Sequence, residues 1–395
     1  MKIAMVSEHA SPIADMGGED GGGQNIHVAR LAAALARQGH EVAVYTRRDD
    51  PRLAERVRAP GDYEVVHVDA GPADRIGKDH LLPFMGDFAY GLLRLWETDR
   101  PDIVHAHFWM SGLASLWAAE RCDVPVVETY HALGTVKRRH QGGADASPPG
   151  RTGFEADVGD RCAGIIATSE EEVRELAAMG VSEDKIALIP CGVDLDLFNP
   201  VGEADDLGSR YQILTAGRLV PRKGFATIIR AMKHLPHTEL VIAGGPVDGQ
   251  VWDDPEGRRL RDIALAEGVS GRVRMPGQIP NDRMPAQYRA ADVVVCAPWY
   301  EPFGIVPLEA MACGVPVVAA AVGGLKDTVE DGVSGTLVDD PTPESIAAAV
   351  QTYLEEGDVR RVTGQAGRLR TCARYSWDAI AAETWKSYEL AVSAA

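Results

Sequence analysis

The segment DVVVCAPWYEPFGIVPLEAMACGVPVV, residues Asp292–Val318, contains a complete strand–helix–strand pattern. It opens with an apolar, β-branched run typical of a buried strand, and EPFG then leads into a helix through IVPLEAMACG. Pro307 falls in the first turn of this helix and Gly314 lies past its end, where these residue types are favoured. A second β-branched run, PVVAAAV, follows at once. This order predicts one unit of a parallel sheet.

The same alternation continues in both directions along the chain. Strands are expected at residues 2–7, 41–46, 64–69, 102–108, 125–131, 164–169, 211–218, 239–245, 272–277, 292–298, 316–322 and 335–339. Nearly continuous apolar strands separated by helices indicate parallel sheets covered on both faces. A polar Gly/Pro segment at 199–209 interrupts the pattern, which favours two doubly wound α/β domains. We expect an N-terminal domain over 1–200, a second domain over 201–376, and a C-terminal helix within 377–395 that packs back on the first domain. Ligands of such sheets bind beyond the carboxyl ends of the strands, and with two sheets the expected site is the cleft between them.

Composition excludes several classes of partner. The 395 residues carry a formal net charge of −18, which argues against nucleic acid or an anionic membrane as the main partner. Six cysteines without C-x-x-C spacing are typical of reduced, buried thiols in a cytoplasmic protein. The first residues show no cleavable signal, and no apolar run reaches about 18 residues, so no membrane insertion is expected.

Two glutamates stand out in the opening segment. Glu301 precedes the helix and Glu309 lies inside it, in otherwise apolar surroundings. An acid within an apolar helix needs a polar partner. Such a pair suggests either acid/base work at a glycosidic bond or two acceptors aimed at different parts of one polyhydroxylated ligand.

Two further motifs lie at predicted strand ends. The glycine-rich run GGEDGGGQN, residues 17–25, offers backbone amides to a phosphate but contains no dinucleotide-binding G-x-G-x-x-G. The run GRLVPRKG, residues 217–224, lacks the second glycine and the Ser/Thr of an NTPase phosphate loop. It leaves Arg218 and Lys223 as cations that can neutralise a diphosphate. His131 ends another strand, where a structural and a catalytic role are equally plausible.

Taken together, GGGQN, HAHFWMSG, HALGTVK, GRLVPRKG and the E-x7-E segment resemble the retaining family-4 glycosyltransferases of GT-B fold. The resemblance covers essentially the whole chain. It is strongest to the branch that holds sucrose synthase, sucrose-phosphate synthase and the inositol-phosphate N-acetylglucosaminyltransferase of mycothiol synthesis. The resemblance implies two Rossmann-like domains that face each other across a cleft.

The resemblance also implies roles for individual residues. For the nucleotide-sugar donor, it implies that Arg218 and Lys223 bind the diphosphate, which the amide of Gly23 also faces. Glu309 is expected to bind the ribose, and Glu301 to bind the sugar together with the amides of Phe303, Gly304 and Ile305. His131 is expected beside the sugar. His131, Arg218, Lys223 and Glu301 are the expected catalytic residues.

For the acceptor, the resemblance implies a phosphate site made by Lys78 and Arg151. The match is incomplete, because Phe108 (or Trp109) and Ala132 stand where the mycothiol-pathway enzyme has a Tyr and a Thr. Two hydroxyl donors are therefore missing, which argues against inositol 1-phosphate itself while favouring a phosphorylated or otherwise anionic acceptor.

The sequence thus predicts a retaining hexosyltransferase that moves a sugar from a UDP- or GDP-sugar to a small polar acceptor. No cofactor and no metal are expected, because Arg218 and Lys223 supply the positive charge. A sucrose-phosphate synthase, which transfers glucose from UDP-glucose to fructose 6-phosphate, is one alternative. A nucleotide-sugar-binding protein without turnover is another. A homodimer is left open, and an NAD-dependent oxidoreductase is disfavoured because the glycine fingerprint is missing.

Overall fold

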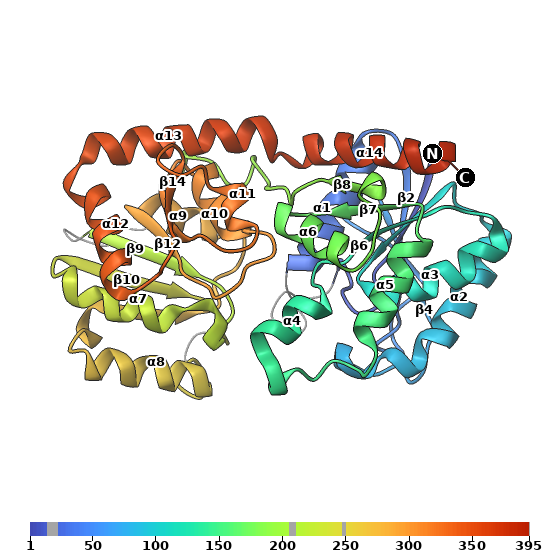
Figure 1. Cartoon of the computed structure of the whole chain (residues 1–395), viewed down its shortest axis with the longest axis horizontal. Coiled ribbons are helices and arrows are strands. Elements are labelled where there is room, and N and C mark those ends of the chain that lie inside the picture. Colours follow the sequence, from blue (N-terminus) through green and yellow to red (C-terminus); the bar gives the residue numbers. More distant parts are fainter. Residues whose placement is uncertain (14–22, 205–210, 247–249, 395) are drawn as a thin grey trace. The chain divides into compact units, whose positions relative to one another are not determined.

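Two parallel sheets, each in its own unit of the chain, organise the protein (Figure 1). This computed structural model describes residues 1–13, 23–204, 211–246 and 250–394. The first unit comprises Met1–Pro190 together with Trp377–Ala395, and the second comprises Cys191–Ser376. The chain leaves the first unit after Pro190, earlier than the predicted boundary after residue 200, and re-enters it at Trp377.

The sheet of the first unit has the strand order β3-β4-β2-β1-β5-β6-β7-β8. Its strands are β1 (Lys2–Val6), β2 (Glu41–Arg47), β3 (Arg56–Arg58), β4 (Glu64–Val68), β5 (Ile103–His107), β6 (Val126–Thr129), β7 (Gly164–Ala167) and β8 (Ile186–Leu188). Neighbouring strands run parallel except at the edge, where β3 pairs with β4 in antiparallel register. The carboxyl ends of β1, β5 and β6 therefore lie on the same side of the sheet.

Helices connect these strands, and the C-terminal helix joins them. They are α1 (Gly23–Arg37), α2 (Met85–Thr98), α3 (Trp109–Cys122), α4 (Gly134–Gln141), α5 (Arg151–Arg161), α6 (Glu170–Ala178) and α14 (Trp377–Ala394). Helix α14, red in Figure 1, packs against α1 of the same unit. Arg37 Nη2 lies 2.7 Å from Asp378 Oδ1, and the His40 and Trp385 rings stack with centroids 4.1 Å apart. The last segment of the chain is thus part of the first unit's fold.

The second unit repeats the plan with the strand order β11-β10-β9-β12-β13-β14, in which every described pair is parallel. Its strands are β9 (Tyr211–Ala216), β10 (Thr238–Ala243), β11 (Val273–Gly277), β12 (Val293–Cys296), β13 (Val317–Ala320) and β14 (Gly335–Val338). Its helices are α7 (Phe225–Ala231), α8 (Pro255–Ala266), α9 (Met284–Ala290), α10 (Ile305–Ala312), α11 (Leu325–Thr328), α12 (Pro343–Glu355) and α13 (Gly357–Arg374).

Short 3-10 turns complete both units. They are η1 (Lys78–His80), η2 (Leu82–Phe84), η3 (Gly142–Ala144), η4 (Glu183–Lys185), η5 (Pro221–Lys223), η6 (Met232–His234) and η7 (Ser270–Arg272). Two of these turns carry residues predicted for the site, η1 with Lys78 and η5 with Lys223.

The core of the second unit explains why its strands are apolar throughout. Successive side chains of a strand point to opposite faces of the sheet. In β12, Val293 and Val295 pack into one buried cluster, and Val294 packs into the other. Helices cover both faces, so neither set of side chains meets water, and the strand reads as a continuous β-branched run.

The predicted class, two parallel-sheet α/β domains with a helical C-terminal tail, is confirmed. Two strands were not anticipated, β3 and β8. Each has three residues and lies at an edge of the first sheet, where neither presents a run of buried side chains.

Three other findings bear on the sequence-based expectations. All six cysteines are free, four of them buried, with Cys122 half-buried and Cys372 exposed. No helix in the described ranges is both long and apolar enough to cross a bilayer. Among the described residues, no group of three or more His, Cys, Asp or Glu side chains is arranged to hold a metal ion.

Candidate active site

In the second unit, the ends of β9 and β12 approach each other closely. The turn η5 follows β9, and Gly224 then starts α7 with a φ of 72°. A Cβ at Gly224 would lie 1.8 Å from the carbonyl oxygen of Ala297, just beyond β12, so only glycine fits here. The backbone amide of Trp299 donates to the carbonyl of Arg222 over 2.8 Å. The two loops are therefore held side by side.

This approach brings Lys223 and Glu301 together across 78 positions of sequence. Lys223 Nζ donates to Glu301 Oε2 over 2.5 Å, and both side chains are 16% exposed. Burial acts to raise the pKa of Glu301, but the Lys223 ammonium, Arg222 and the amide of Phe303 hold it below its usual range. Glu301 is thus an ionised carboxylate that keeps Lys223 at the strand end. Arg218 lies exposed on the same loop, directly after Gly217.

The EPFG turn leads from this pair into α10. Gly304 is the N-cap of α10 with a φ of 76°, and a Cβ there would lie 2.9 Å from Thr328 Oγ1. Thr328 Oγ1 in turn donates to the carbonyl of Gly324 over 2.8 Å and lies 3.3 Å from the carbonyl of Phe303. The amides of Phe303, Gly304 and Ile305 therefore belong to a fixed turn at the start of a helix, a place that favours negatively charged or oxygen-rich ligands.

Glu309 lies one turn into α10 and is half-buried. Its Oε2 accepts a hydrogen bond of 2.6 Å from the Tyr288 hydroxyl on α9. Burial raises the pKa of Glu309 to about 7, and the bond from Tyr288 opposes that rise. The two glutamates of the opening segment thus have different environments, since Glu301 is paired with a cation and Glu309 with a neutral hydroxyl.

In the first unit, two strand ends carry residues with strained backbones. Phe108 follows β5 with a φ of 82°, and His131 follows β6 with a φ of 59°. Positive φ values cost free energy in residues other than glycine, and they concentrate at functional sites. His131 Nε2 lies 3.0 Å from His107 Nδ1, and both rings are buried. The strain and this hydrogen bond together fix where the His131 ring lies.

His131 belongs to a buried group of four histidines, which we call the histidine cluster: His27, His105, His107 and His131. Burial lowers the pKa of His27 to about 4 and that of His105 to about 3. It lowers the pKa of the other two well below the usual value, and the neighbouring imidazoles contribute. All four rings are therefore neutral at pH 7. His105 Nδ1 lies 2.7 Å from the Tyr388 hydroxyl, which links the histidine cluster to α14.

Of the glycine-rich run 17–25, only the last three residues are described. Gly23 is the first residue of α1, and residues 14–22 lie outside the described ranges. Gln24 Nε2 donates to Ser7 Oγ over 3.1 Å and to the carbonyl of His107 over 3.3 Å. The first turn of α1 is therefore anchored to the ends of β1 and β5.

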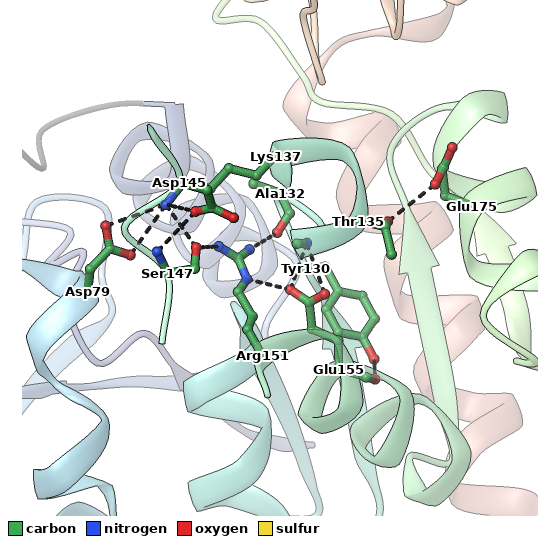
Figure 2. A network of polar contacts seen from close by, with 11 residues as sticks. Asp79, Tyr130, Ala132, Thr135, Lys137, Asp145, Ser147, Arg151, Glu155 and Glu175 are labelled. Atoms are coloured by element: carbon green, nitrogen blue, oxygen red, sulfur yellow. Dashed lines mark hydrogen bonds and ion pairs between the residues drawn. The ribbon is translucent and has the colours of Figure 1, made fainter. Parts of the chain in front are cut away.

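Among the predicted acceptor residues, Arg151 is buried rather than a surface cation. It is the first residue of α5 and is 2% exposed (Figure 2). Its Nε donates to Glu155 Oε1 over 2.7 Å, its Nη1 to Ser147 Oγ over 3.2 Å, and its Nη2 to the carbonyl of Ala132 over 2.5 Å. Its guanidinium carbon lies 5.1 Å from the centre of the Phe108 ring. Phe108, Ala132 and Arg151 therefore lie together in the first unit.

Lys137 was not predicted as a site residue, yet it occupies the centre of this region. Its Nζ lies 3.4 Å from Asp79 Oδ2, 3.2 Å from Asp145 Oδ1 and 2.9 Å from Ser147 Oγ (Figure 2). Ser147 thus accepts from both Lys137 and Arg151. Asp79 follows Lys78 directly in η1, so the predicted cation Lys78 starts the same turn. The sequence offered one signal that Lys137 belongs to the site: it lies on the helix that follows the strand end at His131.

Comparison with known proteins gives this geometry a context. Residues 205–370 match the family model described as "Glycosyl transferases group 1", and residues 21–197 match "Glycosyltransferase Family 4". The chain is 37% identical to the D-inositol 3-phosphate glycosyltransferase of Xylanimonas cellulosilytica, over 96% of this chain and 94% of that protein. The chain belongs to this glycosyltransferase family.

Other members and solved structures agree with this assignment. The glycosyltransferase is 36% identical to D-inositol 3-phosphate glycosyltransferase 1 of Catenulispora acidiphila, over 95% of its own length and 92% of that protein. Sucrose-phosphate synthase from Thermosynechococcus elongatus has 33% identity and a TM-score of 0.89, with 100% of both chains covered. HepE of Anabaena, in complex with UDP-glucose, shares the fold at 20% identity and a TM-score of 0.74, over 98% of this chain and 100% of that one.

The protein is therefore an enzyme of the transferase class that uses a nucleotide sugar. The predictions of GT-B fold and of glycosyltransferase activity are confirmed. In this glycosyltransferase, the second unit presents cations and carboxylates at the carboxyl ends of β9 and β12. The first unit presents the His131 strand end and the Lys137–Arg151 network. The individual roles of these residues remain predictions.

Proposed function

We propose that this glycosyltransferase moves a sugar, with retention of anomeric configuration, from a nucleoside-diphosphate sugar to a small phosphorylated acceptor. In this proposal Arg218 and Lys223 bind the donor diphosphate, because both are cations of the loop that follows β9 and match the family's diphosphate-binding pair. Glu309 accepts the ribose hydroxyls, since a half-buried carboxylate at the strand ends can accept from two neighbouring hydroxyl groups.

The transferred sugar is assigned to Glu301 and the turn that follows it. Glu301 is ionised, and the amides of Phe303, Gly304 and Ile305 start α10 beside it. These groups together offer both acceptors and donors, which the hydroxyl groups of a sugar require. Because His131 is neutral at pH 7, it contributes a hydrogen bond beside the sugar without adding a positive charge.

The reaction follows from where charge develops. The bond between the anomeric carbon and the phosphate oxygen breaks, and negative charge grows on the diphosphate, where Arg218 and Lys223 stabilise it. The acceptor hydroxyl attacks the same face of the sugar, and its proton passes to the departing phosphate oxygen. The ion pair with Lys223 makes Glu301 a poor covalent nucleophile. This supports attack of the acceptor on the same face of the sugar that the diphosphate leaves. The two cations supply the positive charge, so we propose that no metal takes part.

The observation that carries the acceptor assignment is the convergence of Lys137 and Arg151 on Ser147 (Figure 2). Lys78 starts the turn whose next residue, Asp79, binds Lys137. Lys137 and Arg151 thus meet at Ser147, and the turn that Lys78 starts lies beside them. A phosphate would draw Lys137 and Arg151 away from their carboxylate partners. Ala132 and Phe108 offer no side-chain hydroxyl there. The acceptor phosphate would therefore rely on cations and backbone amides.

Two acceptor identities follow from the relatives. Relatives at 35–37% identity are named for D-inositol 3-phosphate, which is the first candidate. The solved structure at 33% identity is a sucrose-phosphate synthase, which makes a sugar phosphate the second candidate. We favour an inositol phosphate or a sugar phosphate over an uncharged polyol, because the converging cations would bind the phosphate group of the acceptor rather than its ring. The free thiols and the nucleotide-sugar donor support a cytoplasmic location.

A panel of donors and acceptors tests the proposal. UDP-N-acetylglucosamine, UDP-glucose and GDP-mannose would each be incubated with D-inositol 3-phosphate, fructose 6-phosphate, and the matching unphosphorylated polyol and sugar. Products are identified by mass spectrometry, and the anomeric configuration is read from NMR coupling constants. We expect product only with a phosphorylated acceptor and with retained configuration. Absence of both transfer and release of free sugar, with every donor and acceptor, would favour a nucleotide-sugar-binding protein without turnover.

A further inference from the structure

We propose that Tyr288 is a positioning residue for nucleotide recognition, because its hydroxyl holds one oxygen of Glu309 and leaves the other oxygen for the ribose. The inference rests on the proposed role of Glu309 in ribose binding. It adds a residue that contacts no substrate and that neither the opening segment nor the resemblance pointed to.

The geometry of the pair supports this role. Tyr288 lies on α9 and is 0% exposed, while Glu309 lies on α10, so two separate helices meet in this hydrogen bond. The Tyr288 hydroxyl donates to Glu309 Oε2 over 2.6 Å. The Tyr288 ring packs edge-on against Phe198, with centroids 5.9 Å apart and an interplanar angle of 69°. The hydroxyl is therefore fixed by packing, and it fixes Glu309 in turn.

A carboxylate needs such a constraint because its terminal torsion is soft. The last torsion of a glutamate side chain has broad, roughly two-fold wells, so an unrestrained carboxylate samples many orientations. Ribose presents two adjacent hydroxyl groups, and binding both requires one orientation. The bond from Tyr288 selects that orientation before the ligand arrives, which lowers the entropic cost of binding.

The hydrogen bond from Tyr288 also stabilises the ionised form of Glu309, because the other described groups around this carboxylate carry no positive charge close to it. The thiols of Cys191, Cys296 and Cys313 interact electrostatically with Glu309, and burial raises the pKa of each to about 12. These thiols are protonated and uncharged at neutral pH, so they do not stabilise a carboxylate. Burial raises the pKa of Glu309 to about 7, and the Tyr288 hydroxyl is the contact that opposes the rise.

More distant charges complete the surroundings. Cys296 also interacts electrostatically with Lys223 and Glu301, and Cys313 with Arg289 and Arg368. Lys223 is paired with Glu301, whereas Arg289 and Arg368 donate to backbone carbonyls. Loss of the Tyr288 hydroxyl therefore leaves Glu309 without its closest donor, and its neutral form becomes more populated. A neutral carboxylic acid is a weaker acceptor for two hydroxyl groups.

The test uses Tyr288→Phe in the full-length chain, because this change removes one oxygen atom and keeps the ring packing. Binding of UDP, GDP and ADP is measured by calorimetry from pH 6 to pH 9, and the tightest ligand is followed. We expect about tenfold weaker binding at pH 7, the effect of one hydrogen bond to a charged group. The defect should shrink as the pH rises to 9, because Glu309 then ionises even without Tyr288.

Two controls separate the possible outcomes. Tyr353→Phe removes a buried hydroxyl that lies 2.9 Å from Thr336 Oγ1, elsewhere in the second unit, and should bind the nucleotide like the wild type. Glu309→Gln should weaken binding by at least as much as Tyr288→Phe. If Glu309→Gln binds normally, the ribose assignment itself fails. The proposal for Tyr288 is wrong if Tyr288→Phe binds the nucleotide like the wild type at every pH, or no more weakly than Tyr353→Phe. If Glu309→Gln still binds weakly in that case, the ribose assignment stands.

Discussion

Replacing Arg151 by alanine should destabilise the first unit as well as weaken acceptor binding. The structure shows a guanidinium that is 2% exposed and that donates from Nε, Nη1 and Nη2 to three different residues. Its removal leaves Glu155, which is 0% exposed, without its cation.

The expected loss can be worked from these contacts. Removing one member of a buried ion pair costs about 3–5 kcal/mol, since the other charge stays buried. Glu155 keeps the Gly134 amide, which donates to its two oxygens over 3.0 and 2.9 Å. Ser147 keeps Lys137, but the carbonyl of Ala132 loses the Arg151 donor. We therefore expect a loss near the lower end of that range, about 3 kcal/mol.

Urea unfolding followed by tryptophan fluorescence measures this loss. Trp109 is buried in the first unit and stacks on Phe154 of α5, with centroids 5.8 Å apart, so it reports on the affected region. The matched control is Arg139→Ala, because Arg139 lies on neighbouring α4, is 55% exposed and pairs with Glu175. An exposed pair contributes about 0–1 kcal/mol. If Arg151→Ala is no less stable than Arg139→Ala, the buried pair does not stabilise the unit and the reasoning is wrong.

Three further predictions concern the acceptor, the metal and pH. Lys78→Ala should raise the KM for a phosphorylated acceptor at least tenfold, about 1.4 kcal/mol, with little change in the donor KM; unchanged acceptor kinetics would remove Lys78 from the site. Turnover should persist in excess EDTA, because Arg218 and Lys223 carry the required charge; loss of activity that manganese restores would contradict this. The first unit should lose stability as the pH falls from about 6.5 toward 4. Burial lowers the pKa of His27 to about 4, so the unfolded chain binds a proton that the folded chain excludes. His27 alone then accounts for about 2 kcal/mol between pH 8 and pH 5, and an unchanged melting temperature over that interval would refute the neutral histidine cluster.

The fold was predictable because its signals are local. Residues 292–318 contain a strand, a helix with Pro307 in its first turn and Gly314 past its end, and a second strand, and the structure places β12, α10 and β13 there. Because most strands are buried on both faces, each appears in the sequence as a continuous apolar run and can be predicted without knowledge of its neighbours. Strands β3 and β8 lack that signal, because they are short and lie at the sheet edge.

The partners of the site residues were not predictable to the same degree. Lys223 and Glu301 were each identified, but their ion pair depends on the approach of two loops 78 residues apart, which Gly224 permits. The pairing of Glu309 with Tyr288 likewise depends on how α9 and α10 pack. Patterns of local sequence carry no direct information on such contacts.

For the acceptor region, one usable signal was overlooked. Arg151 and Glu155 are four positions apart on α5, a spacing at which opposite charges meet on a helix. That spacing could have shown Arg151 to be paired. The partners of Lys137 come from two segments, Asp79 from η1 and Asp145 with Ser147 from the loop before α5, and these contacts required the tertiary structure.

The preference for a phosphorylated acceptor is the most direct test of the proposed function. Initial rates would be measured for one acceptor with its phosphate and for the same acceptor without it, at a fixed, saturating concentration of the best donor. We predict that kcat/KM is at least a hundredfold higher for the phosphorylated form, about 2.7 kcal/mol, because Lys137 and Arg151 converge on Ser147 and Lys78 starts the neighbouring turn. Equal kcat/KM values for the two forms would contradict the account.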